Sequence, residues 1–263
     1  MSKVSIVLPV LNGLELTKEC IDYIRQNTNR DLYNLIVVDD GSTDGTRSLT
    51  AKELNADVVI HSLINRGFGP SCNDGIAASL DLDSEYIVIF NNDILVPPEW
   101  LETLLLEIES NEFVDFCGGK ARLGMVGSVI VEPIGRGPNG YHLTFEDFKR
   151  LHFNGVDTSG KFIVDRKGGP WLFKTDVFKD VGLFDEQFVP GNWEETDLFI
   201  RMYMNGWAIA CTEKTFAYHY AHVTMDREFD NYKALEDNRK RFISKWGRDI
   251  IPHSEVFMER IWN

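Results

Sequence analysis

The chain has 263 residues, 43% of them hydrophobic and 26% charged, which is ordinary for a soluble globular protein of one large domain or two small ones. The net charge of -14 argues against a broad nucleic-acid surface, because phosphate binding needs clustered cations. No apolar run approaches the roughly 18 residues that span a bilayer, and no small-residue cleavage site follows the apolar N-terminal stretch. The four cysteines are far apart in sequence, which predicts neither a zinc site nor a disulfide framework. We therefore expect a cytoplasmic protein.

The first half of the chain alternates between strand and helix patterns. The expected strands cover residues 4–8, 35–38, 58–60 and 86–90. The expected helices cover residues 14–26, 43–54, 73–80 and 99–110. This alternation predicts an α/β fold with a mostly parallel central sheet and helices on both faces.

The second half is less regular. Residues 118–170 are rich in glycine and turn signals, so we expect short antiparallel strands and loops there, with one short helix near 145–151. Helices are expected again at 174–181, 195–204 and 231–246.

Polar residues follow two of the predicted strands. Asp39 and Asp40 end the strand in VVDDGSTDGT, and Asn91, Asn92 and Asp93 end the strand in YIVIFNNDIL. A turn is one explanation, since Asn and Asp are common turn formers. The other is ligand chemistry, because an open α/β sheet binds its ligands beyond the carboxyl ends of its strands.

Two further stretches carry candidate chemistry. NRGFGPSCNDGI, at 65–76, has glycines where a helix begins, so its backbone N–H groups can approach a ligand closely, although such a stretch taken alone is more often a structural turn. GNWEETDLFIRM, at 191–202, places Glu194, Glu195 and Asp197 in the first turn of a helix. These carboxylates either serve a reaction or only complement the helix dipole.

Several enzyme classes lack their signatures here. The first strand leads into PVLNGLEL instead of G-x-G-x-x-G, which excludes the Rossmann dehydrogenase pattern. A P-loop lysine and a G-x-S-x-G elbow are also absent from the sequence.

Taken in order, the motifs resemble those of a known family. VSIVLPVLN, LIVVDDGSTDGT, NRGFGPSCNDGI, YIVIFNNDILVPPEWL, VGLFDEQF and NWEETDLFIRM are similar to the inverting glycosyltransferases of family 2, which have the GT-A fold. The resemblance spans residues 4–222, with a family-like KWG at 245–247. It implies a single GT-A domain at 1–225, with a Rossmann-like sugar-nucleotide half at 1–110 and an acceptor half at 111–225. A C-terminal helical extension would follow at 226–263.

The resemblance also implies a donor site for a UDP- or dTDP-sugar. Pro9 and Leu11 would line the nucleoside, and Asp40 would bond the base or ribose. The remaining residues expected at the donor are Asn65, Arg66, Asn73, Asn91 and Asn92.

The metal site implied by the resemblance would hold Mn²⁺ or Mg²⁺. Asp93 is the one carboxylate at the family's D-x-D position, and His219 falls where many members supply a histidine, with His222 as a rival. Such a cation would act as the Lewis acid for the diphosphate leaving group, and a histidine ligand favours Mn²⁺.

The catalytic base implied by the resemblance is the second residue of an acidic pair. Here the pair is Glu194-Glu195 instead of Glu-Asp, so Glu195 takes the base position with a side chain one methylene longer. Glu194 and Asp197 would cap the helix or orient the acceptor. Trp171 would stack on an acceptor sugar or be buried.

We therefore expect a metal-dependent enzyme that moves a sugar to a hydroxyl of a saccharide, lipid-linked or other acceptor, in polysaccharide or glycoconjugate synthesis. The alternative is a non-catalytic sugar-nucleotide or glycan-binding module of the same fold. A related sugar nucleotidyltransferase would need a glycine-rich, Arg-containing N-terminal signature that this sequence lacks. The basic helix at 238–248 would meet an anionic membrane surface at its periphery or form an ordinary solvated face.

Overall fold

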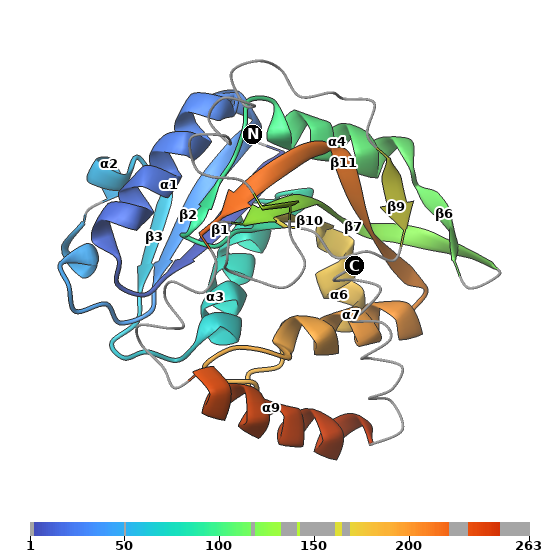
Figure 1. Ribbon diagram of the computed structural model, residues 1–263. Coiled ribbons are helices and arrows are strands. Elements are labelled where there is room, and N and C mark those ends of the chain that lie inside the picture. Colours follow the sequence, from blue (N-terminus) through green and yellow to red (C-terminus); the bar gives the residue numbers. More distant parts are fainter. Residues whose placement is uncertain are drawn as a thin grey trace.

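Strand β1 (Val4–Val10) lies inside a central sheet, and all of its residues are buried. The computed structural model describes residues 3–49, 51–116, 119–132, 141–142, 161–164, 169–220 and 231–247. Strands β2 (Tyr33–Asp39) and β4 (Tyr86–Ile89) pair with β1 in parallel, and β3 (Val58–His61) pairs in parallel with β2. The carboxyl ends of these strands therefore meet at one edge of the sheet (Figure 1).

Helices cover both faces of this parallel part because successive residues of β1 point to opposite sides. Val4, Ile6 and Leu8 belong to one apolar cluster with helices α1 (Leu14–Asn27) and α4 (Trp100–Ser110). Val7 belongs to a second cluster, with α3 (Phe68–Asp81), α6 (Thr175–Val181) and α7 (Glu194–Met204). The expected α/β fold with helices on both faces is confirmed.

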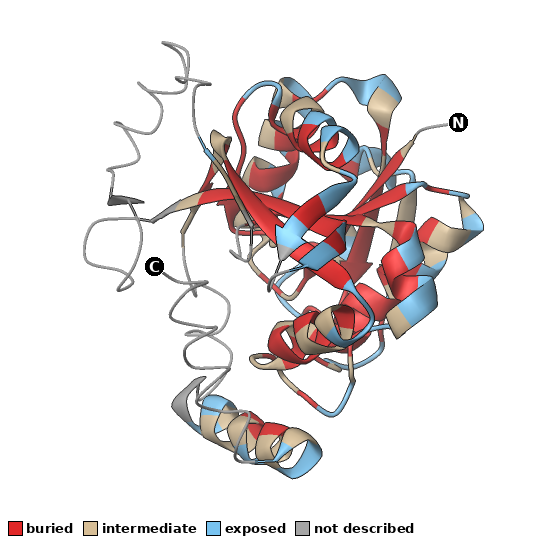
Figure 2. Cartoon of the chain, turned by 90° about the vertical axis from the view of Figure 1, so that its right-hand side faces the viewer, coloured by how far each residue is buried: buried red, intermediate tan, exposed pale blue. Residues whose placement is uncertain are grey.

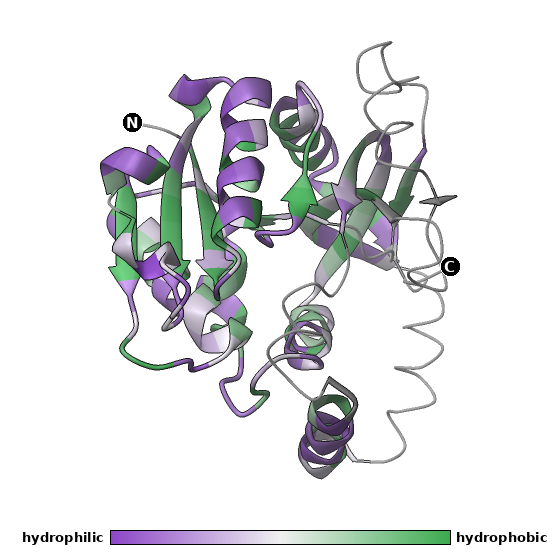
Figure 3. Cartoon of the chain, turned by 60° about the vertical axis from the view of Figure 1, so that its left-hand side comes forward, coloured by the Kyte–Doolittle hydropathy of each residue, from purple (hydrophilic) through white to green (hydrophobic). Residues whose placement is uncertain are grey.

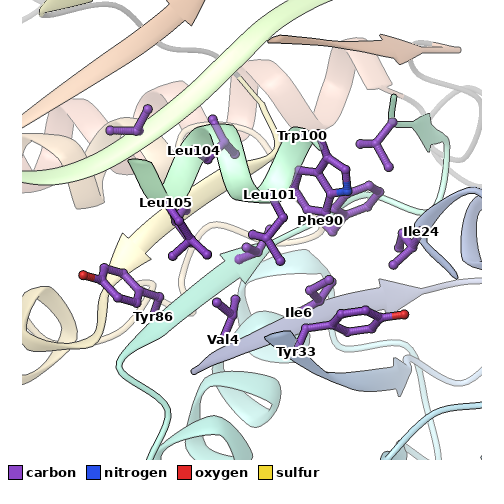
Figure 4. Packing of buried hydrophobic residues seen from close by; sticks show 14 of the residues in the cluster. Val4, Ile6, Ile24, Tyr33, Tyr86, Phe90, Trp100, Leu101, Leu104 and Leu105 are labelled. Atoms are coloured by element: carbon purple, nitrogen blue, oxygen red, sulfur yellow. The ribbon is translucent and has the colours of Figure 1, made fainter. Parts of the chain in front are cut away.

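Aromatic packing closes the α4 side of the sheet. The Phe90 and Trp100 rings meet edge to face with centroids 5.5 Å apart, and Trp100 Nε1 donates to Thr28 Oγ1 at 2.7 Å. Figure 4 shows Trp100, Phe90 and Leu101 packed above Val4 and Ile6. A buried indole needs such a hydrogen bond because burial separates its N–H from the water that would otherwise accept the bond.

The second half of the sheet is mixed. The order continues from β4 through β10 (Trp171–Lys174), β7 (Gly119–Glu132) and β11 (Trp207–His219) to β5 (Ile94–Leu95). Strands β7 and β11 run in parallel, whereas β10 is antiparallel to β4 and β7, and β5 is antiparallel to β11. The short strands beside this path are β6 (Phe113–Phe116), β8 (Tyr141–His142) and β9 (Phe162–Val164). Figures 2 and 3 show that the strands are largely buried and apolar.

The register between β11 and β7 is interrupted. Thr212 pairs with Ser128 and Phe216 pairs with Val129, so residues 213–215 bulge out of β11. Lys214, in this bulge, reaches Glu107 of α4 at 2.6 Å.

The structure differs from the sequence predictions at four elements. The helix expected at 43–54 is a 3₁₀ turn at Thr46–Ser48 and a short α2 (Ala51–Leu54), because Asp44 accepts hydrogen bonds from Thr46 and from the start of α1. The strand β7 is much longer than the short strands expected after residue 118, and β11 was not predicted. The helix expected from residue 73 begins at Phe68. The helix expected near 145–151 lies outside the described residues.

The last described helix, α9 (Asn231–Trp246), has the predicted bounds and lies beside α7 (Figure 1). The expected boundary at residue 225 falls outside the described residues. None of the helices in the described ranges is long and apolar enough to cross a membrane.

Candidate active site

A cleft of about 270 Å³ opens at the carboxyl ends of the parallel strands. Most of the side chains predicted from the sequence to bind substrate or metal line it. These are Pro9, Leu11, Asp40, Asn65, Asn91, Asn92, Asp93, Trp171, Glu194, Glu195 and His219.

Asp40 fixes the loop that forms one wall of the cleft. Its Oδ1 accepts from the backbone N–H of Arg66 at 2.8 Å, and its Oδ2 accepts from the N–H of Gly67 at 2.8 Å. Burial raises the pKa of this carboxyl, while the two N–H groups oppose that rise. Gly67 has φ +99°, and a Cβ there would lie 2.9 Å from the carbonyl oxygen of Pro190, so a side chain is excluded. Asp40 therefore acts as an anchor for residues 65–67.

The strand-end triplet is held by its first two residues. Asn92 Nδ2 donates to Thr17 Oγ1 at 3.1 Å, and the Asn91 carbonyl accepts from the backbone N–H of Ile94 at 3.2 Å. The turn therefore has a defined shape, and it places Asp93 in the cleft wall.

Asp93 and His219 form a close pair. Asp93 Oδ1 lies 3.1 Å from His219 Nε2, and the two side chains are only 7% and 15% exposed. The residues are brought together by the pairing of β5 with β11, in which Ile94 is opposite His219, and by a hydrogen bond from the Tyr220 N–H to the Asp93 carbonyl at 3.0 Å.

The chemistry of this pair fits a divalent cation. A carboxylate oxygen suits Mg²⁺ and Mn²⁺, and an imidazole nitrogen is a better ligand for Mn²⁺. Within the described part of the chain no group of three or more His, Cys, Asp or Glu side chains could hold a metal. The pair would therefore need oxygen atoms from substrate or solvent to complete a coordination shell. The rival ligand His222 lies outside the described residues.

The acidic pair forms the first two residues of α7. Glu194 is buried and Glu195 is half-buried, and both line the cleft from the first turn of the helix, where its dipole favours negative charge. The two preceding residues, Asn192 and Trp193, have left-handed backbones with φ 73° and 76°. Such conformations are uncommon for residues other than glycine.

Trp171 is half-buried in β10 and lines the cleft. Its ring meets Phe199 of α7 edge to face, with centroids 6.0 Å apart. Sequence reasoning missed several other lining residues, among them Ser71, Ile130, Gly191 and Asn192. The position of Gly191 and Asn192 next to the acidic pair was the available signal for those two.

Three predicted site residues are not among those that line the cleft. Asp197 is buried and accepts hydrogen bonds from Arg201 Nε at 2.9 Å and Trp246 Nε1 at 2.8 Å. Asn73 exchanges two hydrogen bonds of 2.9 Å with the backbone of Phe184. The Arg66 side chain bonds Asp74 and Ser62. In this geometry the three side chains connect segments of the protein.

Comparisons with known proteins agree on one family. The model of Glycosyl transferase family 2 matches residues 5–182. Glycosyltransferase GlyG of Streptococcus pneumoniae serotype 4 is 25% identical over 178 residues, which are 66% of this chain and 53% of that protein. The chain thus spans about half the length of this relative.

Solved structures share the fold. Mannosyltransferase PcManGT from Pyrobaculum calidifontis, in complex with GDP-Man and Mn²⁺, superposes with a TM-score of 0.61 at 18% identity, over 88% of this chain and 59% of its own. GalNAc-T7 with UDP, GalNAc and Mn²⁺ superposes with a TM-score of 0.66 at 14% identity, over 93% of this chain and 48% of its own.

Proposed function

Because the chain belongs to glycosyl transferase family 2 and has the GT-A fold, we propose that it transfers a sugar from a nucleoside-diphosphate sugar to a hydroxyl acceptor, with inversion at the anomeric carbon. What supports this proposal is that one cleft is lined both by the Asp93–His219 pair and by Glu194 and Glu195. The pair suits the diphosphate, and the carboxylates suit the acceptor hydroxyl.

The donor nucleoside would lie against Pro9, Leu11 and the loop that Asp40 anchors. The sequence resemblance favours a UDP- or dTDP-sugar. One structural neighbour binds GDP-Man and another binds UDP, so guanine nucleotides also belong among the candidates.

Asp93 and His219 would hold Mn²⁺ or Mg²⁺ together with diphosphate oxygens. When bound, the cation would neutralise the charge that develops on the leaving diphosphate. The two residues hold one oxygen ligand and one nitrogen ligand at a fixed position in the cleft wall. Both side chains are largely buried.

Glu195 would accept the proton of the acceptor hydroxyl. As the hydroxyl oxygen forms its bond to the anomeric carbon, the bond from that carbon to the diphosphate breaks on the opposite face, which inverts the configuration. The proton passes to the Glu195 carboxylate. Glu194, more deeply buried at the helix start, would orient the acceptor, and the Trp171 ring would support a sugar.

The acceptor class we propose is a glycan or glycolipid hydroxyl, in polysaccharide or glycoconjugate synthesis. A cytoplasmic location and membrane contact through α9 stay predictions from the sequence and carry no part of this proposal.

The first experiment finds the donor. Thermal shift with UDP-, dTDP- and GDP-sugars in Mn²⁺, in Mg²⁺ and in EDTA should show stabilisation by one nucleotide class that depends on the cation, because a ligand that binds only the native state raises its stability. A protein that binds this donor but never releases nucleoside diphosphate, with water or with any glycan acceptor, would be a binding module instead of an enzyme.

The second experiment tests the base. Glu195→Gln keeps size and polarity but cannot accept the proton, so the rate of nucleoside diphosphate release should fall on the order of 100- to 10,000-fold while donor affinity is kept. Glu194→Gln is the matched control on the same helix turn and should lose far less. An inactive Glu194→Gln beside an active Glu195→Gln would move the base by one residue.

A further inference from the structure

The turn that leads into α7 is held in an unfavourable backbone conformation. Asn192 and Trp193 are consecutive residues with φ 73° and 76°, and Trp193 is the residue that immediately precedes the helix. Left-handed residues with large side chains persist only where their surroundings fix them. The carboxylate proposed as the base, Glu195, is two residues further on.

The surroundings that fix this turn come from α9. Asn238 is fully buried, and its Nδ2 donates to the carbonyl oxygens of Gly191 at 2.7 Å and Asn192 at 3.1 Å. Arg241 donates to Asn238 Oδ1, which leaves the two amide hydrogens facing the two carbonyls. The side chain therefore satisfies two successive carbonyls of the turn.

Apolar contacts on the same helix hold the next residue. The ring of Phe242, which is fully buried, lies 4.7 Å from the ring of Trp193 and 6.4 Å from that of Phe188. The Phe242 ring thus contacts one residue before the turn and one within it. This packing opposes rotation of the Trp193 backbone out of its left-handed conformation.

Two basic residues of α9 make further contacts with residues before and after the turn. Arg241 donates to the carbonyl of Val189 at 3.2 Å, and Lys245 lies 2.6 Å from both Asp185 and Asp197. Asp197 is on α7, so Lys245 joins the loop, the helix that carries Glu195, and α9. These two basic residues, expected on a helix that meets either a membrane surface or solvent, are turned toward the protein.

We propose that α9 is a clamp that positions Glu195, and that Asn238 is its positioning residue. The inference rests on the proposed transfer function, because the group that it positions is the proposed base. Misplacing a catalytic group by about 1 Å costs roughly 100-fold in rate, so loss of the two Asn238 hydrogen bonds should lower turnover without changing the donor site.

The test uses Asn238→Asp, which keeps the shape of the side chain and the partnership with Arg241 but removes both donated hydrogens. Lys240→Ala is the matched control, since Lys240 is on the same helix and pairs with Asp237. Hydrogen exchange of the backbone amides at 189–197 should speed up in Asn238→Asp and stay unchanged in Lys240→Ala. If Asn238→Asp does not fold, Arg241→Met removes both the hydrogen bond to Asn238 Oδ1 and the one to the Val189 carbonyl, and it should also speed up exchange at 189–197.

Turnover then separates positioning from general loss of structure. Asn238→Asp should lower the rate roughly 10- to 100-fold while the affinity for UDP, dTDP or GDP with Mn²⁺ stays within about twofold. In a Glu195→Gln background the same substitution should have no further effect on the rate, because a positioning residue acts through the group that it positions.

Two results would overturn the clamp. One is unchanged exchange at 189–197 in Asn238→Asp and in Arg241→Met. The other is an Asn238→Asp variant that loses the same factor in rate whether residue 195 is Glu or Gln. The exchange measurement needs no substrate, so it still decides the inference if the protein turns over no nucleotide sugar and the proposed function fails.

Discussion

Asp40→Asn is the substitution that tests most directly how the loop at 65–67 is held in the wall of the cleft. In the native structure each carboxylate oxygen of Asp40 accepts one backbone N–H, from Arg66 and from Gly67, at 2.8 Å. Asparagine keeps one acceptor oxygen, and its amide group then faces the remaining N–H.

The expected cost follows from these two contacts. A hydrogen bond to a charged group contributes about 1.5 to 3 kcal/mol, and a buried donor left without a partner costs about 1 to 3 kcal/mol. Burial of the Asp40 carboxylate is unfavourable and raises its pKa. The neutral asparagine avoids this cost of burying a charge, which offsets part of the loss. The net destabilisation should be about 1 to 3 kcal/mol, and nucleotide affinity should fall because the anchored loop lines the cleft.

The neighbouring Asp39→Asn is the matched control. Asp39 Oδ1 accepts from the Ser42 N–H at 3.1 Å, and Oδ2 lies 3.3 Å from His61 Nδ1. Asparagine can keep the first contact and donate to His61, so this variant should lose less.

Urea unfolding at neutral pH measures both variants as changes in midpoint with an unchanged slope. If Asp40→Asn costs no more than Asp39→Asn, or less than about 0.5 kcal/mol, the two backbone contacts do not anchor the loop as we argue.

Two further predictions concern the cation and the acid limit of stability. Asp93→Ala should abolish Mn²⁺-dependent nucleotide binding in calorimetry, and His219→Ala should weaken activity more than His222→Ala; unchanged affinity in Mn²⁺, or the reverse order of the histidines, would reassign the ligands. Burial alone would raise the Asp185 pKa, but hydrogen bonds from Lys245 and Gln187 outweigh it and set that pKa below its usual range. The stability lost in Asp185→Asn should therefore be largest above the unfolded pKa of about 3.9 and shrink as pH falls through the lowered folded pKa, as followed by unfolding free energy against pH. If the difference in unfolding free energy between the native protein and Asp185→Asn does not vary with pH, the charge of Asp185 does not contribute to stability.

The first half of the chain could be predicted because its strands and helices have clear hydrophobic periods. Unbroken apolar runs such as that of β4 end on polar residues, and the same rule that identified these ends located Asp40 and Asp93 at one edge of the sheet. The strand β7 could not be predicted in this way, since its glycines are typical of loops. Gly124 is in this strand because a Cβ there would lie 2.8 Å from Val177 Cγ2 of α6, a contact that no local pattern contains.

Roles that depend on distant partners were the least accessible. Asn73 was assigned to the donor, yet its partner in the structure is the backbone of Phe184, 111 residues away. Asp197 was assigned to the acceptor, yet it pairs with Lys245 of α9. A single sequence shows that such residues are polar and near a motif, and it does not show which long-range segment has already satisfied them.

The bulge at 213–215 makes the position of His219 beside Asp93 depend on the length of β11. Side chains of a strand alternate between faces, so inserting or deleting one residue between the bulge and the strand end would turn His219 away and present Tyr218 or Tyr220 to Asp93 instead. The contact between Lys214 and Glu107 fixes the bulge to α4. The bulge therefore cannot easily absorb an added or deleted residue. Substitutions in this strand should therefore be tolerated far better than changes in its length, and grafts of a relative's β11 onto this chain should preserve the residue count from Thr212 to His219.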